Sequence, residues 1–251
     1  MPLDIQQIRA RRPQNELRYF ETIPSTMERA ARLAAEGAPH GTVVIAEEQT
    51  AGLGRLGRSW ISEPEVGIYC SILLRLPLSP SSLPVATLLL GLATADAVQK
   101  TTNLACDLRW PNDVLVNERK VAGILAQLVG SCVVAGIGLN VNNRELPAGL
   151  RTPATSILIE SNGHPQSREN ILIQLLESLD SFNSLLAAEG TPAILRAFTA
   201  ASSYVLNRRV ILEETQQTGT TAGLDPNGFL LVHFDTGRTE RILAGGVRAA
   251  L

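Results

Sequence analysis

The sequence contains few of the residues that build metal centres and disulfide frameworks. Its three cysteines, Cys70, Cys106 and Cys132, are widely separated and lie within apolar segments. We therefore expect buried thiols in a reducing compartment rather than disulfides. The three histidines are equally scattered, which argues against a zinc site.

An excess of basic charge is also absent. The net charge is −2 and the isoelectric point is about 6.0, so the chain offers no general positive field for nucleic acid. No charge-free apolar run reaches the ~18 residues of a membrane span, and no signal-peptide pattern opens the chain. We therefore expect a cytoplasmic protein that binds neither membrane nor DNA and recognises anions only locally.

The length and composition fit one sizeable core with a small second domain. The chain has 251 residues, of which 45% are hydrophobic and 18% are charged, and it shows no internal repeat. Residues 1–16 are polar and irregular, so we expect a frayed or loosely docked leader, too short for a helix-turn-helix domain.

Hydrophobic periodicity and cap residues predict strands and helices up to about residue 204. Ser25 followed by Glu28 fits a capping box that starts a helix, and Gly37 fits its end. The same junction could also aim the hydroxyls of Ser25 and Thr26 at a polar ligand. Strands are expected at residues 17–22, 42–46, 67–76, 114–116, 121–128 and 132–137, and helices at 29–36, 85–100, 168–189 and 191–202.

The pattern changes after residue 205. Turn sequences ending at Gly228 and Gly237 separate short apolar runs. Short strands at this spacing predict a small barrel, attached by residues 203–207. The strand candidates are residues 209–213, 219–224, 229–234 and 239–243.

A glycine- and arginine-rich stretch follows the strand expected at 42–46. Gly52, Gly54 and Gly57 alternate there with Arg55 and Arg58. Glycine allows a sharp bend or a close approach of backbone to a ligand, and arginine offers a forked cation for carboxylates and phosphates. The stretch therefore fits either a mobile loop that orders around an anion or a solvated basic turn.

A second informative stretch lies in the middle of the chain. A proline precedes Asn112 and Asp113 at a strand start, which is typical of a site wall rather than a core. Lys120 opens the next strand, where a solvated turn lysine is the ordinary alternative. Gly136 and Gly138 lack the third glycine and the helix of a dinucleotide fingerprint, so they indicate backbone close to a ligand or another strand.

These features favour electrostatic over covalent catalysis. No serine or cysteine has a nearby histidine to activate it as a nucleophile. Cationic donors around a pocket suit the attack of a carboxylate on a nucleotide α-phosphate, which forms an acyl-adenylate. A loop folded over that intermediate would keep water out.

Five motifs, taken in order, resemble those of the biotin–protein ligases, also called biotin–[acetyl-CoA-carboxylase] ligases. Each motif is weak alone, but their order and spacing from about Tyr19 onward cover nearly the whole chain. The motifs are Ser25-Thr26, Gln49-Thr-Ala-Gly-Leu-Gly-Arg-Leu-Gly-Arg58 with Trp60, Arg109-Trp-Pro-Asn-Asp113, Arg119-Lys-Val-Ala-Gly-Ile-Leu125 and Gly136-Ile-Gly-Leu-Asn140.

The resemblance implies an α/β (α+β) ligase domain at residues 1–204, with a mixed, largely antiparallel sheet and flanking helices, and a small SH3-like β-barrel at residues 205–251. It implies an enzyme that activates biotin with MgATP to biotinyl-5′-AMP and transfers biotin to a lysine of a biotin carboxyl carrier protein of acetyl-CoA carboxylase. The carrier would dock through a strand or hairpin. The ligase would be a monomer or homodimer, and the short leader implies no repressor activity at DNA.

The resemblance also implies the roles of individual residues. Lys120, Arg55 and Asp113 would be catalytic, with Asp113 orienting the acceptor lysine or taking its proton. ATP and Mg²⁺ would enter together, without a metal site of the protein's own. The biotin site would comprise Ser25, Thr26, Gln49, Gly52, Leu53, Gly54, Arg55, Lys120 and Gly123. The ATP site would comprise Arg55, Arg58, Trp60, Asn112, Lys120 and Asn140.

One position departs from the family pattern, because Leu53 stands where the loop usually carries its first arginine. If that position acts through its backbone N–H, little is lost. If its guanidinium holds phosphate or orders the loop, this enzyme would release its adenylate more readily.

Two other functions fit parts of the pattern. A lipoate–protein ligase or octanoyl transferase would share the fold, although Gln49 and the paired hydroxyls favour a ureido ligand. A non-catalytic adaptor could instead bind a nucleotide through the Gly/Arg loop and a partner through the small barrel. Loss of transfer on replacing Lys120 separates a ligase from a binder.

Overall fold

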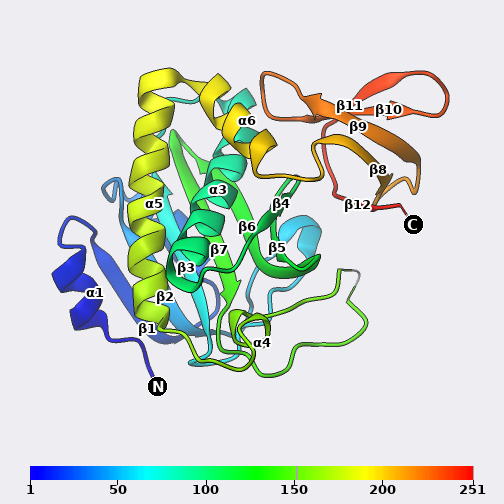
Figure 1. The fold of residues 1–251 in the computed structure, drawn as a ribbon. Helices are drawn as coiled ribbons and strands as arrows, with labels where there is room; N and C mark the ends of the chain where they lie inside the picture. Colours follow the sequence, from blue (N-terminus) through cyan, green and yellow to red (C-terminus); the bar gives the residue numbers. More distant parts are fainter. Residues whose placement is uncertain (151, 251) are drawn as a thin grey trace.

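A seven-stranded sheet forms the centre of the molecule (Figure 1), and the computed structural model describes residues 1–150 and 152–250. Strands β1 Leu17–Ile23 and β2 Val43–Gln49 are parallel, and the other described neighbours in the sheet are antiparallel. The strand order is β1-β2-β3-β7-β6-β5-β4. The remaining strands are β3 Gly67–Leu74, β4 Asp107–Arg109, β5 Asp113–Val116, β6 Arg119–Val129 and β7 Cys132–Asn140. The expected mixed, largely antiparallel sheet is confirmed.

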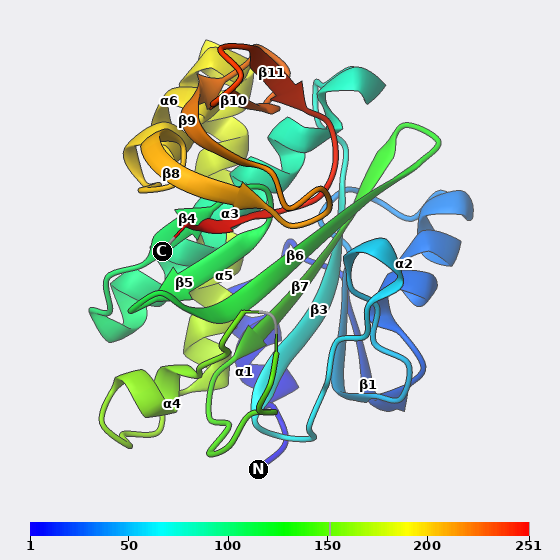
Figure 2. The ribbon, with the colours of Figure 1, turned by 90° about the vertical axis from the view of Figure 1, so that its right-hand side faces the viewer.

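Helices cover both faces of this sheet. Because successive side chains of a strand point to opposite faces, Val43 and Ile45 of β2 enter the larger core and Val44 enters a smaller one. Helix α3 packs against β6 and α5 on the larger core, and α2 packs against β2, β3 and β7 on the opposite face (Figure 2). The helices are α1 Ile5–Arg11, α2 Thr26–Ala35, α3 Leu83–Thr102, α4 Ile157–Glu160, α5 Arg168–Glu189 and α6 Thr191–Ala200, with 3₁₀ turns η1 Arg55–Gly57 and η2 Pro80–Ser82.

Helices α3 and α5 are long and apolar enough to cross a membrane, by length and composition alone. In this fold they pack against each other, and 67% of the apolar window of Pro80–Thr102 is buried inside the protein. Enclosure by other elements explains why α3 carries apolar residues on all sides.

Cap residues set the helix ends as the sequence predicts. Ser25 Oγ accepts from Glu28 N at the start of α2, and Ser167 caps α5 in the same way. Gly190 ends α5 with φ of 71°, a left-handed conformation that glycine adopts without strain. The sequence analysis missed β4 and the C-terminal β12 Val247–Ala249, because strands of three residues are too short to show a period.

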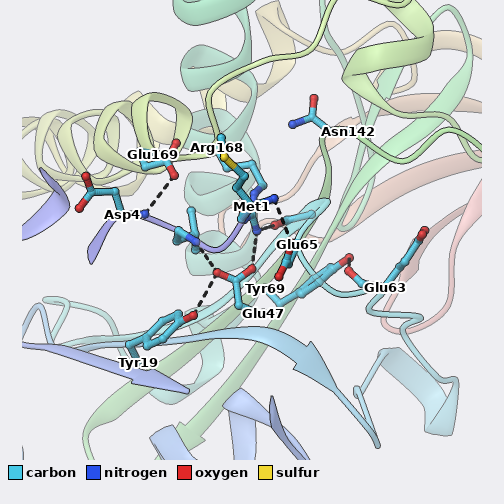
Figure 3. A network of polar contacts seen from close by, with 12 residues as sticks. Met1, Asp4, Tyr19, Glu47, Glu63, Glu65, Tyr69, Asn142, Arg168 and Glu169 are labelled. Carbon is cyan, nitrogen blue, oxygen red and sulfur yellow. Dashed lines mark hydrogen bonds and ion pairs between the residues drawn. The ribbon is translucent and has the colours of Figure 1, made fainter. Parts of the chain in front are cut away.

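The N-terminal segment is firmly docked, so the expectation of a frayed leader is wrong. Leu3 and Ile8 are buried in the larger core. Figure 3 shows the polar network around Glu47 and Arg168 beside them. Leu3 N donates to Glu47 at 2.5 Å, and Arg168 pairs with Glu47 at 2.7 Å. Arg168 also donates to Met1 O at 2.6 Å. Local periodicity could not reveal these contacts, because the partners are 44 to 167 residues apart in the chain.

A second, five-stranded antiparallel sheet follows α6 and lies beside the β4–β5 end of the first (Figure 1). Among the described residues β11 and β12 pair on one side only, so this sheet is open and a closed barrel is not observed. Trp110 Nε1 donates to Gly228 O at 3.0 Å and joins the two parts. The strands are β8 Leu206–Leu212, β9 Thr218–Leu224, β10 Leu230–Phe234, β11 Thr239–Ile242 and β12, in the order β11-β10-β9-β8-β12.

Candidate active site

Residues 52–60 form a tight hairpin that follows the end of β2. Gly54 N donates to Arg58 O at 2.7 Å and closes the turn. Within the turn, Leu56 (φ 56°) and Gly57 (φ 72°) both have left-handed backbone. That conformation is unfavourable for leucine, and it persists where surrounding contacts hold it. The Gly/Arg stretch is therefore a defined turn with an arginine at each end.

A cavity of about 270 Å³ lies between this hairpin, the β5–β6 hairpin and the C-terminal sheet. Its wall combines cations, amides and apolar side chains, which suits a ligand with a flat apolar part and several anionic groups. The polar wall includes Arg55, Arg58, Asn112, Asp113, Lys120, Asn140 and Glu213, and the apolar wall includes Leu56, Trp60, Ile61, Leu146 and Leu150.

A smaller cavity, of about 50 Å³, adjoins the first. Leu53 lines it, and the backbone of Leu53 forms a bridge with Ser59 across the hairpin. The structure therefore uses the main chain of Leu53 to build the turn. Both cavities are lined by Gly54, Arg55, Trp60, Asn112 and Lys120.

Thr26 and Gln49 lie on the wall of the smaller cavity and are bonded to each other. Gln49 Oε1 accepts from the backbone N and the Oγ1 of Thr26, each at 2.9 Å. Two serines that the sequence analysis did not single out extend this cluster. Gln49 Nε2 donates to Ser62 Oγ at 2.9 Å, and Ser71 Oγ donates to Thr26 Oγ1 at 2.9 Å. The buried Ser25 caps α2 instead and does not line either cavity. The cluster offers both donors and acceptors to a ligand.

Arg55 and Lys120 come from different hairpins and line both cavities. Arg55 Nη1 donates to Asn112 Oδ1 at 3.1 Å and to Gly245 O at 2.9 Å. Burial lowers the pKa of Arg55 from its ordinary value, against the raising effect of Asp113. An arginine side chain does not lose its proton in proteins, so Arg55 remains a cation. The structure thus brings two predicted cations to the junction of the cavities.

Asp113 holds Lys120 through a partly buried ion pair. Asp113 Oδ1 lies 2.6 Å from Lys120 Nζ, and Oδ2 lies 2.5 Å from Arg109 Nη2. Burial raises the pKa of Asp113, but Lys120 and Arg109 outweigh that effect and hold the pKa below its usual value. Asp113 is therefore ionised, and each of its oxygens already has a cationic partner. The sequence analysis named both residues without pairing them.

The indole of Trp60 lies on two facing glycines. Gly123 of β6 and Gly138 of β7 are direct partners in the sheet. A Cβ atom would lie 2.8 Å from the Trp60 ring at Gly123 and 2.3 Å from it at Gly138, so only glycine leaves room. Lys120 Nζ lies 5.5 Å from the ring centroid, within reach of a cation–π interaction. The indole Nε1 is buried without a partner in the described structure.

The C-terminal sheet contributes two groups that the sequence analysis did not assign to the site. Glu213, directly after β8, lies 3.3 Å from Arg58, and Gly245 O accepts from Arg55. These partners are 155 and 190 residues apart, so no local signal in the sequence marks them. Asn140, at the end of β7, is buried and donates to a backbone carbonyl while it lines the larger cavity.

Comparison with known proteins identifies the family. The model of the biotin/lipoate A/B protein ligase family matches residues 19–142. The chain is 34% identical to the biotin–[acetyl-CoA-carboxylase] ligase of Mycobacterium tuberculosis over 223 residues, which cover 86% of this chain and 82% of the relative. The chain belongs to the biotin protein ligase family. This ligase is also 31% identical to the biotin–[acetyl-CoA-carboxylase] ligase of Paracoccus denitrificans, with 85% and 92% of the two chains covered.

A solved biotin protein ligase has the same fold as this one. The structure of the Aquifex aeolicus biotin protein ligase in complex with biotin and ATP matches with a TM-score of 0.80 at 31% identity. The match covers 94% of this ligase and 99% of that chain, so it includes most of both sheets. The ligase therefore shares with its family the mixed sheet that carries the two cavities.

Proposed function

We propose that this ligase activates biotin with MgATP to biotinyl-5′-AMP and transfers biotin to a lysine of a biotin carboxyl carrier protein of acetyl-CoA carboxylase. The observation that carries the proposal is the meeting of Arg55 and Lys120 at the junction of two cavities. Thr26 and Gln49 lie in one cavity and Arg58 lies in the other. A carboxylate at the junction would face two cations that offset its repulsion from a phosphate.

Biotin would bind with its ureido ring at Thr26 and Gln49 and its carboxylate at the junction. The connecting chain would then run past Gly123, where the Trp60 indole now lies. The indole therefore has to move toward the larger cavity when the chain enters. The proposed biotin site comprises Thr26, Gln49, Gly52, Leu53, Gly54, Arg55, Lys120 and Gly123, with Ser25 acting indirectly as the cap of α2.

MgATP would occupy the larger cavity. Arg55 and Lys120 would contact the α-phosphate, Arg58 the outer phosphates, and Trp60 the adenine side. Asn112 and Asn140 would hold the nucleotide or its magnesium. Within residues 1–150 and 152–250 no group of three His, Cys, Asp or Glu side chains could hold a metal ion. We propose that Mg²⁺ enters with ATP as part of the substrate, bound through the phosphates.

The first step needs positioning and charge rather than proton transfer. An oxygen of the biotin carboxylate attacks the α-phosphorus, a C–O–P anhydride forms, and pyrophosphate leaves. Arg55 and Lys120 stabilise the negative charge that gathers on the α-phosphate oxygens in the transition state. Asp113 and Asn112 keep these two cations in place through the contacts described above.

In the second step the neutral ε-amine of the carrier lysine attacks the acyl carbon. An amide forms, AMP leaves, and the amine gives up a proton. Asp113 is the carboxylate proposed to orient this amine or take its proton. Because both oxygens of Asp113 contact cations, taking the proton would require it to release Lys120 first.

We further propose two domains, a ligase domain at residues 1–204 and an SH3-like C-terminal domain at residues 205–251. The separate five-stranded sheet supports this division, and its edge strands would have to approach each other to complete a barrel. The carrier would dock as a strand or hairpin at the open edge of the site, and the enzyme would act in the cytoplasm as a monomer or homodimer.

The assay combines the purified protein with ATP, a carrier domain and either labelled biotin or labelled lipoate. We expect ATP-dependent labelling of the carrier lysine by biotin, and a loss of about 100-fold or more in Lys120→Ala, because a cation at the developing charge is removed. Lys100 is the other lysine of the chain and pairs with Asp96 on α3, so Lys100→Ala is the matched control. Preferential incorporation of lipoate would refute the assignment.

A further inference from the structure

We propose that Glu213, in the C-terminal sheet, is a positioning residue for the nucleotide, because it holds Arg58 at the wall of the larger cavity. The inference rests on the proposed function, which places the outer phosphates of ATP at Arg58. It extends that function by giving the C-terminal domain a defined part in binding ATP. The geometry supports it in three independent ways.

The first observation is an asymmetry between the two partners. Glu213 Oε2 lies 3.3 Å from Arg58 Nη2, and the side chains are 7% and 50% exposed. The carboxylate is therefore the enclosed partner and the guanidinium the more exposed one. A guanidinium has five N–H donors in a planar fork, so a contact through Nη2 leaves donors for phosphate oxygens. Glu213 can orient Arg58 without occupying it.

The second observation is how the carboxylate is fixed. Glu213 N donates to Gly246 O at 2.9 Å, which joins the end of β8 to the segment before β12. A Cβ atom at Gly246 would lie 3.1 to 3.5 Å from the carboxyl atoms of Glu213, so the carboxyl group packs directly against the Gly246 backbone. The position of the carboxylate is thus set by the C-terminal sheet.

The third observation is the strained turn that Arg58 closes. Leu56 has φ of 56°, and an arginine lies close on either side of it. Arg55 bonds Gly245 O and Arg58 bonds Glu213, so both contacts reach the same C-terminal sheet. An unfavourable backbone conformation persists only where the surroundings hold it. The C-terminal sheet therefore fixes the phosphate end of the hairpin at residues 52–60.

The test measures steady-state adenylate formation, and the signal is the biotin-dependent exchange of labelled pyrophosphate into ATP. We expect Glu213→Ala to raise KM for ATP about tenfold, the effect of losing one charge-assisted hydrogen bond, while KM for biotin stays the same. Glu213→Gln keeps an acceptor oxygen and should recover part of the loss. Glu240→Ala, which removes an exposed carboxylate of β11 that lines neither cavity, should leave both constants unchanged.

A double-mutant cycle separates positioning from a general effect on folding. In an Arg58→Ala background, Glu213→Ala should change KM for ATP no further, because the group through which Glu213 acts is gone. A lower KM for ATP in Glu213→Ala would mean that Glu213 competes with phosphate, and it would overturn the proposal. The proposal is also overturned if Glu213→Ala raises KM for ATP equally with and without Arg58. It is overturned as well if Glu213→Gln raises KM for ATP as much as Glu213→Ala does and KM for biotin rises in parallel.

The same measurements distinguish this proposal from the function on which it rests. If the unmodified protein shows no biotin-dependent exchange, the proposed function fails and takes this inference with it. If the unmodified protein is active and Glu213→Ala has the same KM for ATP, only the role of Glu213 is refuted.

Discussion

Replacing Asp113 by asparagine tests the partly buried ion pair at the centre of the site. The change is almost isosteric, but it leaves Lys120 and Arg109 close together without a counter-charge. Breaking a buried pair by removing one partner costs about 3–5 kcal/mol. Lys120 is 24% exposed and can turn toward solvent, and Arg109 keeps its bond to Thr152 Oγ1 at 2.6 Å. We therefore expect the free energy of unfolding to fall by an amount near the lower end of this range, about 3 kcal/mol.

The pH dependence of this loss has a definite sign. The folded pKa of Asp113 lies below its unfolded value of about 3.9. Its stabilising effect is therefore complete above about pH 4 and is lost as the pH falls through the folded pKa. The difference in unfolding free energy between the parent and Asp113→Asn should be constant from about pH 7 to about pH 5, and it should shrink below about pH 4.

Urea denaturation at several pH values measures this difference, and thermal unfolding should show a fall in Tm of roughly 6–12 °C. The control is Asp235→Asn, which removes a carboxylate paired with Arg209 at 2.5 Å on the exposed surface. Such pairs are screened by water, so no change in stability should be resolved. A difference for Asp113→Asn below about 1 kcal/mol at pH 7, or one that grows toward acid, would contradict the reasoning.

Two further predictions concern the smaller cavity. In Gly138→Ala the new methyl group would lie 2.3 Å from the Trp60 ring, so the indole must leave the sheet and its fluorescence should shift to longer wavelength. Gly136→Ala on the same strand is the control, because its new methyl group would contact the flexible side chain of Met27 and not the indole. An identical spectral shift in this control would contradict displacement of Trp60 as the cause. Thr26→Val removes the hydroxyl between Gln49 and Ser71 and should weaken biotin binding about tenfold in calorimetry, because buried partners lose their bonds. Unchanged biotin affinity would remove Thr26 from the proposed site.

The sequence by itself determined the local structure and the residue types of the site. Ser25, Ser167 and Gly190 act where their short-range chemistry puts them, at helix ends. Short apolar runs placed the buried strands correctly, because a strand covered on both faces carries apolar side chains along its whole length. Arg55 and Lys120 could be named in advance, because their motifs have recognisable order and spacing.

Only the tertiary structure decided which of these groups meet. Glu213 reaches Arg58 across 155 residues of chain, and the buried Glu47–Arg168 pair that docks the N-terminal segment spans 121. The Trp60 indole can pack against the sheet because β6 and β7 place Gly123 and Gly138 opposite each other. Local sequence carries propensities and periods, whereas such contacts depend on how strands and helices pack, and this is the physical reason that the chain alone could not predict them.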